Sequence, residues 1–569
     1  MIRPARGGGA PAPARGELGP VGGGTQRRRL ATEGARPRWP VLAVLCVSLL
    51  VVSLDNTILN VAIPDIVRSL RAASSDLQWA IDAYSVVFAG LLLVLGNVGD
   101  RLGRKWVLAA GIVVFGLGSA ASAFSGSPDR LIAARAFMGI GAAAIMPATL
   151  SILTNVYVDL EERSRAIGIW SATTGLGVAV GPVLGGWLLA HFWWGSVFLV
   201  NVPICVLGLV LVLAIVPNSR DERAMRPDVV GAVLSTGGMG VLLWGIIEAP
   251  TRTWTSPLVL GAVVAGAGVL LAFVLWERRS DHPMLELAFF RSRRFSTAIV
   301  GMALVIFALT GGLFLFTQYL QFLLGYSALA TGLRIAPIAA ILLVAAPASI
   351  ALDRRFGTKP VVFAGMGLVA ASFLLLSSTT VHGGYGNALP AFMMMGAGAG
   401  LAFAPCTAAV MGSVSLERAG VGSATNSAAL QLGGATGVAV LGSLLNARYQ
   451  GHLGALLAHR AVPHDVLQLV LGSLGGALTV AQQAGGHLGT ELALGARQAF
   501  VDGMDLAVVA AAGVVAAASV VVLWLLPNRP PDGGATPRPA DAPEDQIGSG
   551  TMSMAPQGHS LAQSPHPLQ

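Results

Sequence analysis

Long apolar runs recur along almost the whole of this chain. Each is about 20 residues long, which lets a helix cross the ~30 Å hydrocarbon core of a bilayer. Of the 569 residues, 54% are hydrophobic and only 11% are charged, whereas a soluble domain carries about 25% charged residues. Fourteen such runs are present, at residues 40–63, 79–98, 106–125, 131–154, 166–190, 196–216, 229–249, 257–276, 298–318, 332–351, 360–378, 388–412, 423–445 and 504–526. The chain is therefore predicted to be an all-α integral membrane protein with fourteen transmembrane helices.

Basic residues predict the orientation of these helices. With the N-terminus placed in the cytoplasm, three clusters fall in cytoplasmic loops: Arg101/Arg104/Lys105, Arg291/Arg293/Arg294 and Arg354/Arg355/Lys359. An excess of Lys and Arg in cytoplasmic loops is the usual bias of membrane proteins. The net charge of +8 is therefore explained by topology, and no nucleic-acid partner is predicted. An even number of spans places both termini in the cytoplasm of a multi-pass cell-membrane protein.

The two ends of the chain differ in composition from the spans. Residues 1–38 are rich in Arg, Gly and Pro and have no apolar core, so they are predicted to be a disordered basic cytoplasmic N-terminus and not a signal peptide. Residues 528–569 are predicted to be a disordered cytoplasmic tail. Cys46, Cys205 and Cys406 each lie in a predicted span, so neither a disulfide framework nor a metal site is expected, and no cofactor is predicted.

Two carboxylates lie inside the predicted spans of the first half. Asp55 lies about 12 Å below the end of the first span, counting ~1.5 Å per residue. A charge at that depth is expensive and by default marks a functional site. Asp82 lies just inside the second span, between Trp79 and Tyr84, which suit the membrane interface. Asp82 is predicted to act in the outer half of the membrane. The alternative interpretation is that its side chain only faces the membrane interface.

Arg135, in the fourth span, lies at a depth similar to that of Asp55. It is about 9 Å from the outer end of its span. Opposite charges at matched depth neutralise each other, which is how intramembrane charges are usually tolerated. We therefore predict an Asp55–Arg135 pair and assign proton coupling to Asp55, Arg135 and Asp82. Structural pairing without coupling is the alternative.

Two short patterns stand out in the first half. The stretch from Gly96 to Lys105 has the order Gly-x-x-x-Asp-Arg-x-Gly-Arg-Lys, which resembles the signature between helices 2 and 3 of the major facilitator superfamily. Arg135, followed by Gly139 and Gly141, resembles the fourth-helix signature. The first resemblance implies a conformational latch on the cytoplasmic side, formed by Gly96, Asp100, Arg101, Gly103 and Arg104. A solvated charged turn is the alternative.

The fifth span carries a stripe of glycines. Gly177, Gly181 and Gly185 recur every four residues and permit close helix packing, while Pro182 bends the helix. Packing alone would explain the stripe. However, residues 175–186 resemble the antiporter signature of the superfamily, which is found in proton-coupled exporters more than in importers.

Two further segments narrow the resemblance. Leu54–Pro64 reads Leu-Asp-x-Thr-Ile-x-Asn-Val-Ala-x-Pro, and Trp193–Pro203 leads into the sixth span. Together they look like the fourteen-helix drug:proton antiporter family of the EmrB/QacA type, and the resemblance covers about residues 40–526. The order Trp-Trp-Gly-Ser departs from the family's Trp-Arg-Trp-x-Phe, which we expect to affect a loop and not the mechanism.

Short sequence similarities between the two halves of the chain indicate two copies of one unit. Leu352–Lys359 echoes Gly99–Lys105, which gives Asp353 and Arg354 an equivalent latch role. Together with this repeat, the family resemblance implies the major facilitator fold, with two six-helix bundles, two inserted helices and the substrate site between the halves. The predicted domains are an N-terminal six-helix bundle at 39–217, two inserted helices at 218–280, and a C-terminal six-helix bundle at 281–527 that includes an extracellular segment at 447–503.

The second half is expected to supply apolar walls rather than charge. Met and Phe surfaces adapt to ligands of different shape, although such residues in a span also serve as lipid contacts. The predicted substrate-binding residues are Asp82, Tyr84, Phe314, Tyr319 and Met394. The extracellular segment is expected to be a solvated loop, in which Val466–Ala481 is too short to cross the membrane.

These patterns predict a proton-coupled antiporter that exports lipophilic, cationic drugs or toxic compounds by alternating access. Burial disfavours a charged carboxylate and a nearby guanidinium favours it, so Asp55 beside Arg135 can exchange a proton as its hydration changes. The predicted partners are a small-molecule substrate, protons and the bilayer, with a monomer as the working unit and no enzymatic activity. The alternatives are a narrow exporter of an endogenous natural product or antibiotic, a proton-coupled importer or uniporter, and a non-transporting membrane receptor.

Overall fold

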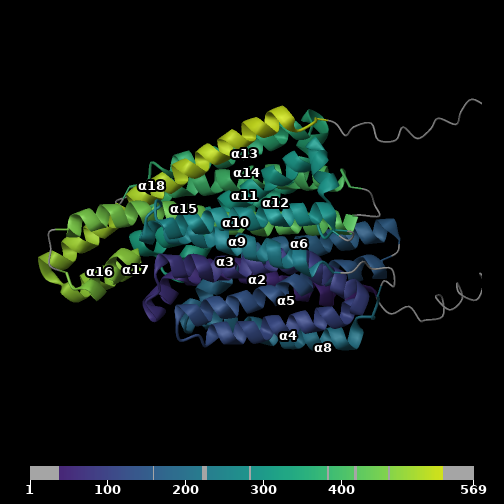
Figure 1. Cartoon of the computed structure of the whole chain (residues 1–569), viewed down its shortest axis with the longest axis horizontal. Coiled ribbons are helices and arrows are strands. Elements are labelled where there is room, and N and C mark those ends of the chain that lie inside the picture. Colours follow the sequence, from purple (N-terminus) through teal and green to yellow (C-terminus); the bar gives the residue numbers. More distant parts are fainter. Residues whose placement is uncertain are drawn as a thin grey trace, which may run out of the picture. The chain divides into compact units, whose positions relative to one another are not determined.

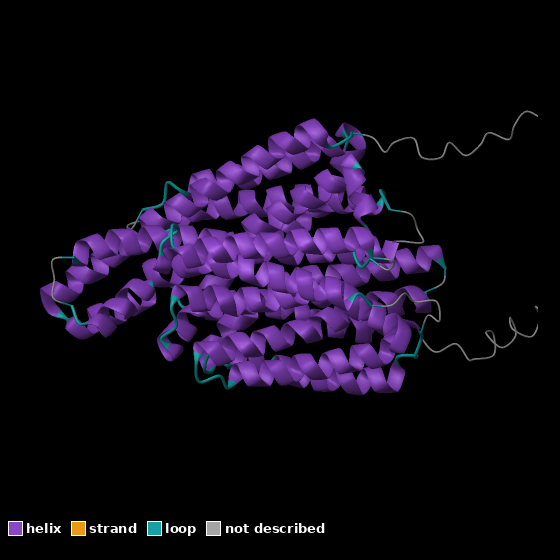
Figure 2. Ribbon diagram, in the orientation of Figure 1, coloured by secondary structure: helices purple, strands orange, loops and turns teal. Residues whose placement is uncertain are grey.

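The computed structural model describes residues 38–157, 159–220, 227–280, 283–380, 383–414, 419–458 and 462–528. In these residues every regular element is helical (Figure 2). Fourteen helices are long and apolar enough to cross a membrane. The predicted fold class and number of spans are therefore confirmed. The two tails predicted to be disordered lie outside the described residues, apart from Arg38 and Asn528.

The first half contains six spans. They are α2 (Arg38–Leu70), α3 (Ser74–Leu102), α4 (Arg104–Ala123), α5 (Pro128–Val156), α6 (Leu160–His191), and the short α7 (Ser196–Leu199) followed by α8 (Asn201–Ile215), which together make the sixth span. Local sequence sets their ends. Ser127 caps α5 by accepting a hydrogen bond from the Arg130 amide, and Pro128 occupies the first turn, where no amide donor is needed.

Two inserted helices form a hairpin between the halves. α9 (Val229–Arg252) and α10 (Pro257–Arg279) pack against each other. Asp228 caps α9 by accepting from the Gly231 amide at 2.8 Å, and the Trp276 indole of α10 donates to both of its carboxylate oxygens. This polar contact joins the first turn of α9 to the last turn of α10. The hairpin then packs against α3 and against α15 of the second half.

The second half repeats the six-span arrangement. It contains α11 (Arg293–Gln318), which continues into the π-helical turn η2 (Tyr319–Leu323), then α12 (Ala328–Phe356), α13 (Thr358–Leu376), α14 (Tyr385–Met411), α15 (Ala419–Leu457) and α18 (Gly486–Leu525). A short 3-10 turn, η1 (Leu287–Arg291), precedes α11. Two six-helix bundles and an inserted pair are thus present, as the fold class predicted from the sequence has them.

The segment 447–503 is not the solvated loop that we expected. α15 continues to Leu457 and α18 begins at Gly486, and between them lie α16 (His464–Gly472) and α17 (Leu474–Ala484) (Figure 1). The stretch is rich in Ala, Leu and Gln, which favour helix. Several of its apolar residues are buried in the main hydrophobic core, among them Leu453, Val470 and Ala477. With 9 and 11 residues, α16 and α17 are too short to span a bilayer.

The internal repeat extends to the turns that follow α3 and α12. Gly103 and Gly357 both have left-handed backbones, with φ of 114° and 87°, which glycine adopts without strain. The chain leaving the last helix of each half folds back over its turn. The Arg104 amide donates to the Ser219 carbonyl at 2.9 Å, and the Lys359 amide donates to the side-chain oxygen of Asn528 at 3.3 Å.

The two halves meet at one end of the bundle. A Cβ at Gly332 of α12 would lie 2.1 Å from the Pro182 carbonyl oxygen of α6, and a Cβ at Gly186 would lie 2.5 Å from the Leu329 Cα. The Gln321 side chain donates to the Val61 carbonyl at 2.8 Å across the same boundary. These residues all lie toward the predicted external ends of their helices, so the halves are closed there.

Replacement of Gly332 tests this contact. Gly332→Ala places a methyl group against a backbone carbonyl that cannot move aside without shifting α6, so we expect a loss of about 1–3 kcal/mol in stability. The measurement is the thermal unfolding of the purified protein in detergent. Gly168→Ala on α6 is the matched control, because nothing lies within 4 Å of its added Cβ. Equal melting temperatures for the two variants would contradict the close packing of α6 and α12.

Candidate functional site

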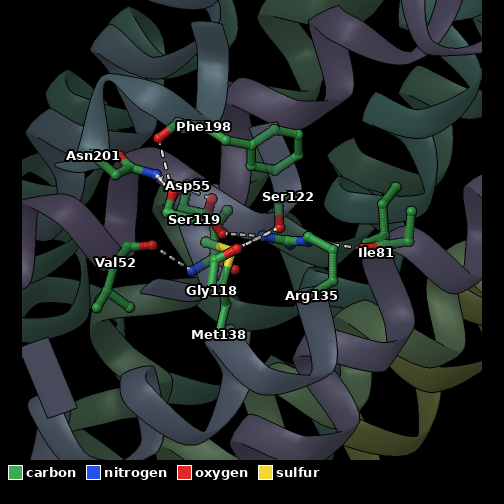
Figure 3. A network of polar contacts seen from close by, with 12 residues as sticks. Val52, Asp55, Ile81, Gly118, Ser119, Ser122, Arg135, Met138, Phe198 and Asn201 are labelled. Carbon is green, nitrogen blue, oxygen red and sulfur yellow. Dashed lines mark hydrogen bonds and ion pairs between the residues drawn. The ribbon is translucent and has the colours of Figure 1, made fainter. Parts of the chain in front are cut away.

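The predicted pair of Asp55 and Arg135 is present and fully buried. Asp55 lies in the middle of α2 and Arg135 in the second turn of α5, and a guanidinium nitrogen of Arg135 contacts Asp55 Oδ2 (Figure 3). Arg135 Nε also donates to the Ala80 carbonyl of α3 at 2.9 Å. Its guanidinium lies over the Tyr84 ring, 4.4 Å from the ring centroid. One arginine therefore joins three helices of the first half.

Two polar residues that the sequence analysis did not assign complete this network. The Asn201 side-chain amide lies 3.4 Å from Asp55 Oδ1 and donates to Ser119 Oγ at 3.1 Å. Ser119 in turn donates to the Phe198 carbonyl at 2.9 Å, just before the start of α8 (Figure 3). Each oxygen of Asp55 thus faces a different donor. An asparagine inside the apolar run 196–216 was the available signal, and only the fold shows what it faces.

The glycine stripe of α6 fixes the position of the helix that carries Asp55. An added Cβ at Gly177 would lie 2.5 Å from Ser53 Cβ, and one at Gly181 would lie 2.0 Å from Thr57 Oγ1. At Gly185 the nearest atom would be 2.7 Å away on Ile58. All three glycines face α2, and the α2 residues that they contact lie within three positions of Asp55 in the sequence. Pro182, on the same helix, presents its carbonyl to α12 as described above.

Asp82 has a different environment from Asp55. It is fully buried on α3, and neither of its carboxyl oxygens has a hydrogen-bond partner among the described residues. Gln78, one turn earlier on the same stripe of α3, packs against Gly442 of α15. Val86, one turn later, packs against Ala435 and Ala439 of α15. Asp82 therefore lies between two points where the first and second halves touch.

The remaining predicted substrate-binding residues are not brought together. Tyr84 is buried beneath Arg135 in the first half. Phe314 and Tyr319 are buried in α11 and η2 of the second half, and Met394 is part-buried on α14. A cavity of about 390 Å³ lies between α3, α9, α10, α11 and α15, and its lining includes none of the predicted set. Their role in substrate binding stays a prediction.

The two predicted latch turns differ in their contacts. In the first, Arg104 Nε donates to Asp100 Oδ1 at 2.7 Å within the same half, while Arg101 is exposed. An added Cβ at Gly96 would lie 3.4 Å from Pro147 of α5. In the second turn Arg354 is exposed, and Asp353 has a buried oxygen without a partner among the described residues. The latch role of both turns stays a prediction.

Comparison with known proteins identifies the family. The family model for the Major Facilitator Superfamily matches residues 45–438. The chain belongs to this superfamily. The fourteen-helix drug:proton antiporter resemblance is confirmed by relatives at least 30% identical over most of their length. The multidrug efflux pump LfrA of Mycolicibacterium smegmatis is 35% identical over 488 residues, covering 85% of this chain and 95% of that protein.

Further relatives agree with this assignment. The tetracenomycin C resistance and export protein of Streptomyces glaucescens is 34% identical over 498 residues, covering 86% of this chain and 92% of the relative. Among solved structures, a bacterial homologue of the human lysosomal transporter Spinster, in an inward-facing and unoccupied conformation, superposes with a TM-score of 0.60 at 17% identity. It covers 87% of this superfamily member and 98% of that structure, and it supports the fold.

The buried pair predicts a non-additive mutational effect. Arg135→Met leaves the Asp55 carboxylate buried without its cation, which we expect to destabilise the protein by roughly 3–5 kcal/mol. Adding Asp55→Asn removes the uncompensated charge, so the double variant should be more stable than Arg135→Met alone. Thermal unfolding in detergent at neutral pH measures both. A double variant less stable than the single one would show that the two residues act independently.

Proposed function

We propose that this superfamily member is a proton-coupled antiporter that exports lipophilic, cationic compounds across the cell membrane. The observation that carries the proposal is the buried Asp55–Arg135 pair, supported from α8 by Asn201. The family makes it a transporter, and the names of its relatives describe multidrug efflux and antibiotic export. The antiporter-type glycine stripe on α6 supports export rather than import.

Proton exchange is assigned to Asp55. While the carboxylate is ionised, Arg135 and Asn201 hold α2, α5 and α8 together at one point. Protonation of Asp55 removes the charge that Arg135 neutralises, so the attraction between α2 and α5 falls. Because α2 is in close contact with α6, and α6 touches α12, a change at Asp55 reaches the boundary between the halves. Two arrangements of the halves would then differ in their affinity for a proton.

Asp82 is proposed to carry a proton in this conformation. An ionised carboxylate in the membrane interior without water or a partner costs several kcal/mol or more. Asp82 is fully buried with both oxygens unpartnered among the described residues, so its neutral form is favoured here. When it ionises, the same site attracts a cation strongly because the local dielectric constant is low. This property favours cationic cargo over neutral or anionic cargo.

The two six-helix bundles, at 39–217 and 281–527, are the proposed moving units. The close contacts at Gly332, Gly186 and Gln321 lie at the predicted external end, which supports an inward-facing state. Both termini are proposed to lie in the cytoplasm. The Asp100 and Asp353 turns would close the cytoplasmic side in the opposite state. A monomer is the proposed working unit.

A narrow exporter of one natural product is the second candidate. The tetracenomycin C relative is named for resistance to and export of a single antibiotic, which favours this candidate. Efflux of a panel of unrelated cationic dyes from cells that express the protein separates the two: broad efflux supports multidrug export, and efflux of none supports a narrow substrate. An importer would instead move its substrate into the cytoplasm when the same pH gradient is imposed.

Substitution of the first-span acid tests the coupling. Asp55→Asn cannot exchange a proton, so proton-gradient-driven efflux of ethidium from proteoliposomes should fall to background while the protein remains folded in the membrane. Asp65→Asn on the same helix is the matched control, because Asp65 pairs with Arg68 near the helix end. It should retain most of the efflux.

Retention of gradient-driven efflux by Asp55→Asn would remove the proposed role of that residue. Loss of efflux in both variants would instead point to damage of α2 as a whole. Melting temperatures of the two purified variants distinguish loss of coupling from loss of structure.

A further inference from the structure

The cavity of about 390 Å³ lies to one side of the Asp55 network and touches both halves and the inserted hairpin. α3 of the first half lines it with Val86, α11 and α15 of the second half with Ala303 and Ala429, and the hairpin with Met239 and Phe273. Ligand pockets for small molecules range from about 300 to 1,000 Å³. The volume is therefore sufficient for the body of a small organic compound.

The walls of this cavity suit an apolar guest. None of the residues that line it is charged. Its three hydroxyl groups are already used, because Ser235, Thr425 and Thr436 each donate to a carbonyl of their own helix, at 3.1, 2.8 and 2.8 Å. The side chains therefore offer no free donor to a ligand, and binding would come from burial of apolar surface.

Two residues that line the cavity are also exposed at the protein surface. Val300 in α11, inside the predicted span, is 54% exposed, and Phe290 in η1, just before that span, is 39% exposed. Both lie near the start of α11, at the predicted cytoplasmic side. A compound dissolved in the inner leaflet could therefore enter without first passing through water.

An acid lies just beyond the other end of the cavity. Val86 of the lining is one turn along α3 from Asp82, which corresponds to about 6 Å along the helix axis. Asp82 is fully buried and its carboxyl oxygens have no partner among the described residues. The arrangement along α3 is thus an apolar chamber followed by one unpaired carboxyl group.

We propose that this cavity is a lateral binding site for the apolar body of a membrane-dissolved organic cation, with the inserted hairpin as its outer wall and Asp82 facing the charged end. The proposal rests on the export function and assigns the inserted helices a part in it. The hairpin is held tightly to α3, since a Cβ at Gly90 would lie 1.8 Å from Thr236 Oγ1. Because the guest touches both halves, its affinity depends on how the halves are arranged.

Thiol protection tests occupancy of the cavity. Ala429→Cys places a thiol in the lining, and Val264→Cys places one on α10, where the native side chain is 70% exposed and lies outside the cavity. The purified variants in lipid nanodiscs are labelled with a membrane-permeant maleimide, with and without tetraphenylphosphonium. Labelling is read at each peptide by mass spectrometry, which separates the new thiols from Cys46, Cys205 and Cys406.

Tetraphenylphosphonium should slow labelling of the Ala429→Cys variant several-fold and leave the Val264→Cys variant unchanged. Adding Asp82→Asn to Ala429→Cys should abolish most of this protection. Absence of protection in Ala429→Cys, or equal protection by uncharged tetraphenylmethane, would overturn the proposal, the second result indicating a site for lipid chains. As a second measurement, Ala429→Trp should raise the Kd of tetraphenylphosphonium about tenfold or more, a loss of about 1.4 kcal/mol, and Val264→Trp should not.

Efflux measured in parallel separates this inference from the proposed function. Wild-type proteoliposomes that export tetraphenylphosphonium under a proton gradient, without protection of the Ala429→Cys thiol, would retain the function and reject the lateral site. Protection without any gradient-driven efflux would retain the site and reject the antiporter.

Discussion

A charge buried in hydrocarbon must be neutralised, and the first half of this superfamily member is built around one such neutralisation. Arg135 meets Asp55 from α5, anchors to the backbone of α3 and lies over Tyr84, while Asn201 approaches the second carboxylate oxygen from α8. Four helices therefore share a single polar centre. In a membrane, where apolar helix faces gain little by meeting each other, such a centre specifies which helices pack together.

Close backbone contacts connect this polar centre to the other half of the protein through α6. The three glycines of α6 hold it against α2 on either side of Asp55, and Pro182 on the same helix meets Gly332 of α12 in the other half. Packed interfaces of this kind have discrete arrangements rather than continuous ones. A change in charge at Asp55 can therefore bias the position of one half relative to the other without any direct contact between the acid and α12.

The boundary between the halves at α3 and α15 differs from the one at α6 and α12, because the inserted hairpin covers it and a cavity lies beside it. α9 and α10 cover the line where α3 meets α15, and beneath them the packing is incomplete. Asp82 lies on the α3 stripe between the closed contact at Gln78 and this looser region. Asp55 and Asp82 thus differ in environment: Asp55 contacts an arginine and an amide, whereas Asp82 has no partner among the described residues and lies beside an apolar chamber.

The sequence by itself determined the class of protein, the fourteen spans and the pairing of Asp55 with Arg135, because bilayer thickness dictates run length and intramembrane charge is too costly to be incidental. The family followed from the resemblance of short motifs. Tertiary structure alone decided which neutral residues matter. Asn201 and Ser119 are ordinary polar residues until the fold brings them to Asp55. The chamber beside Asp82 likewise arises from contacts between helices far apart in the chain, which no local pattern encodes.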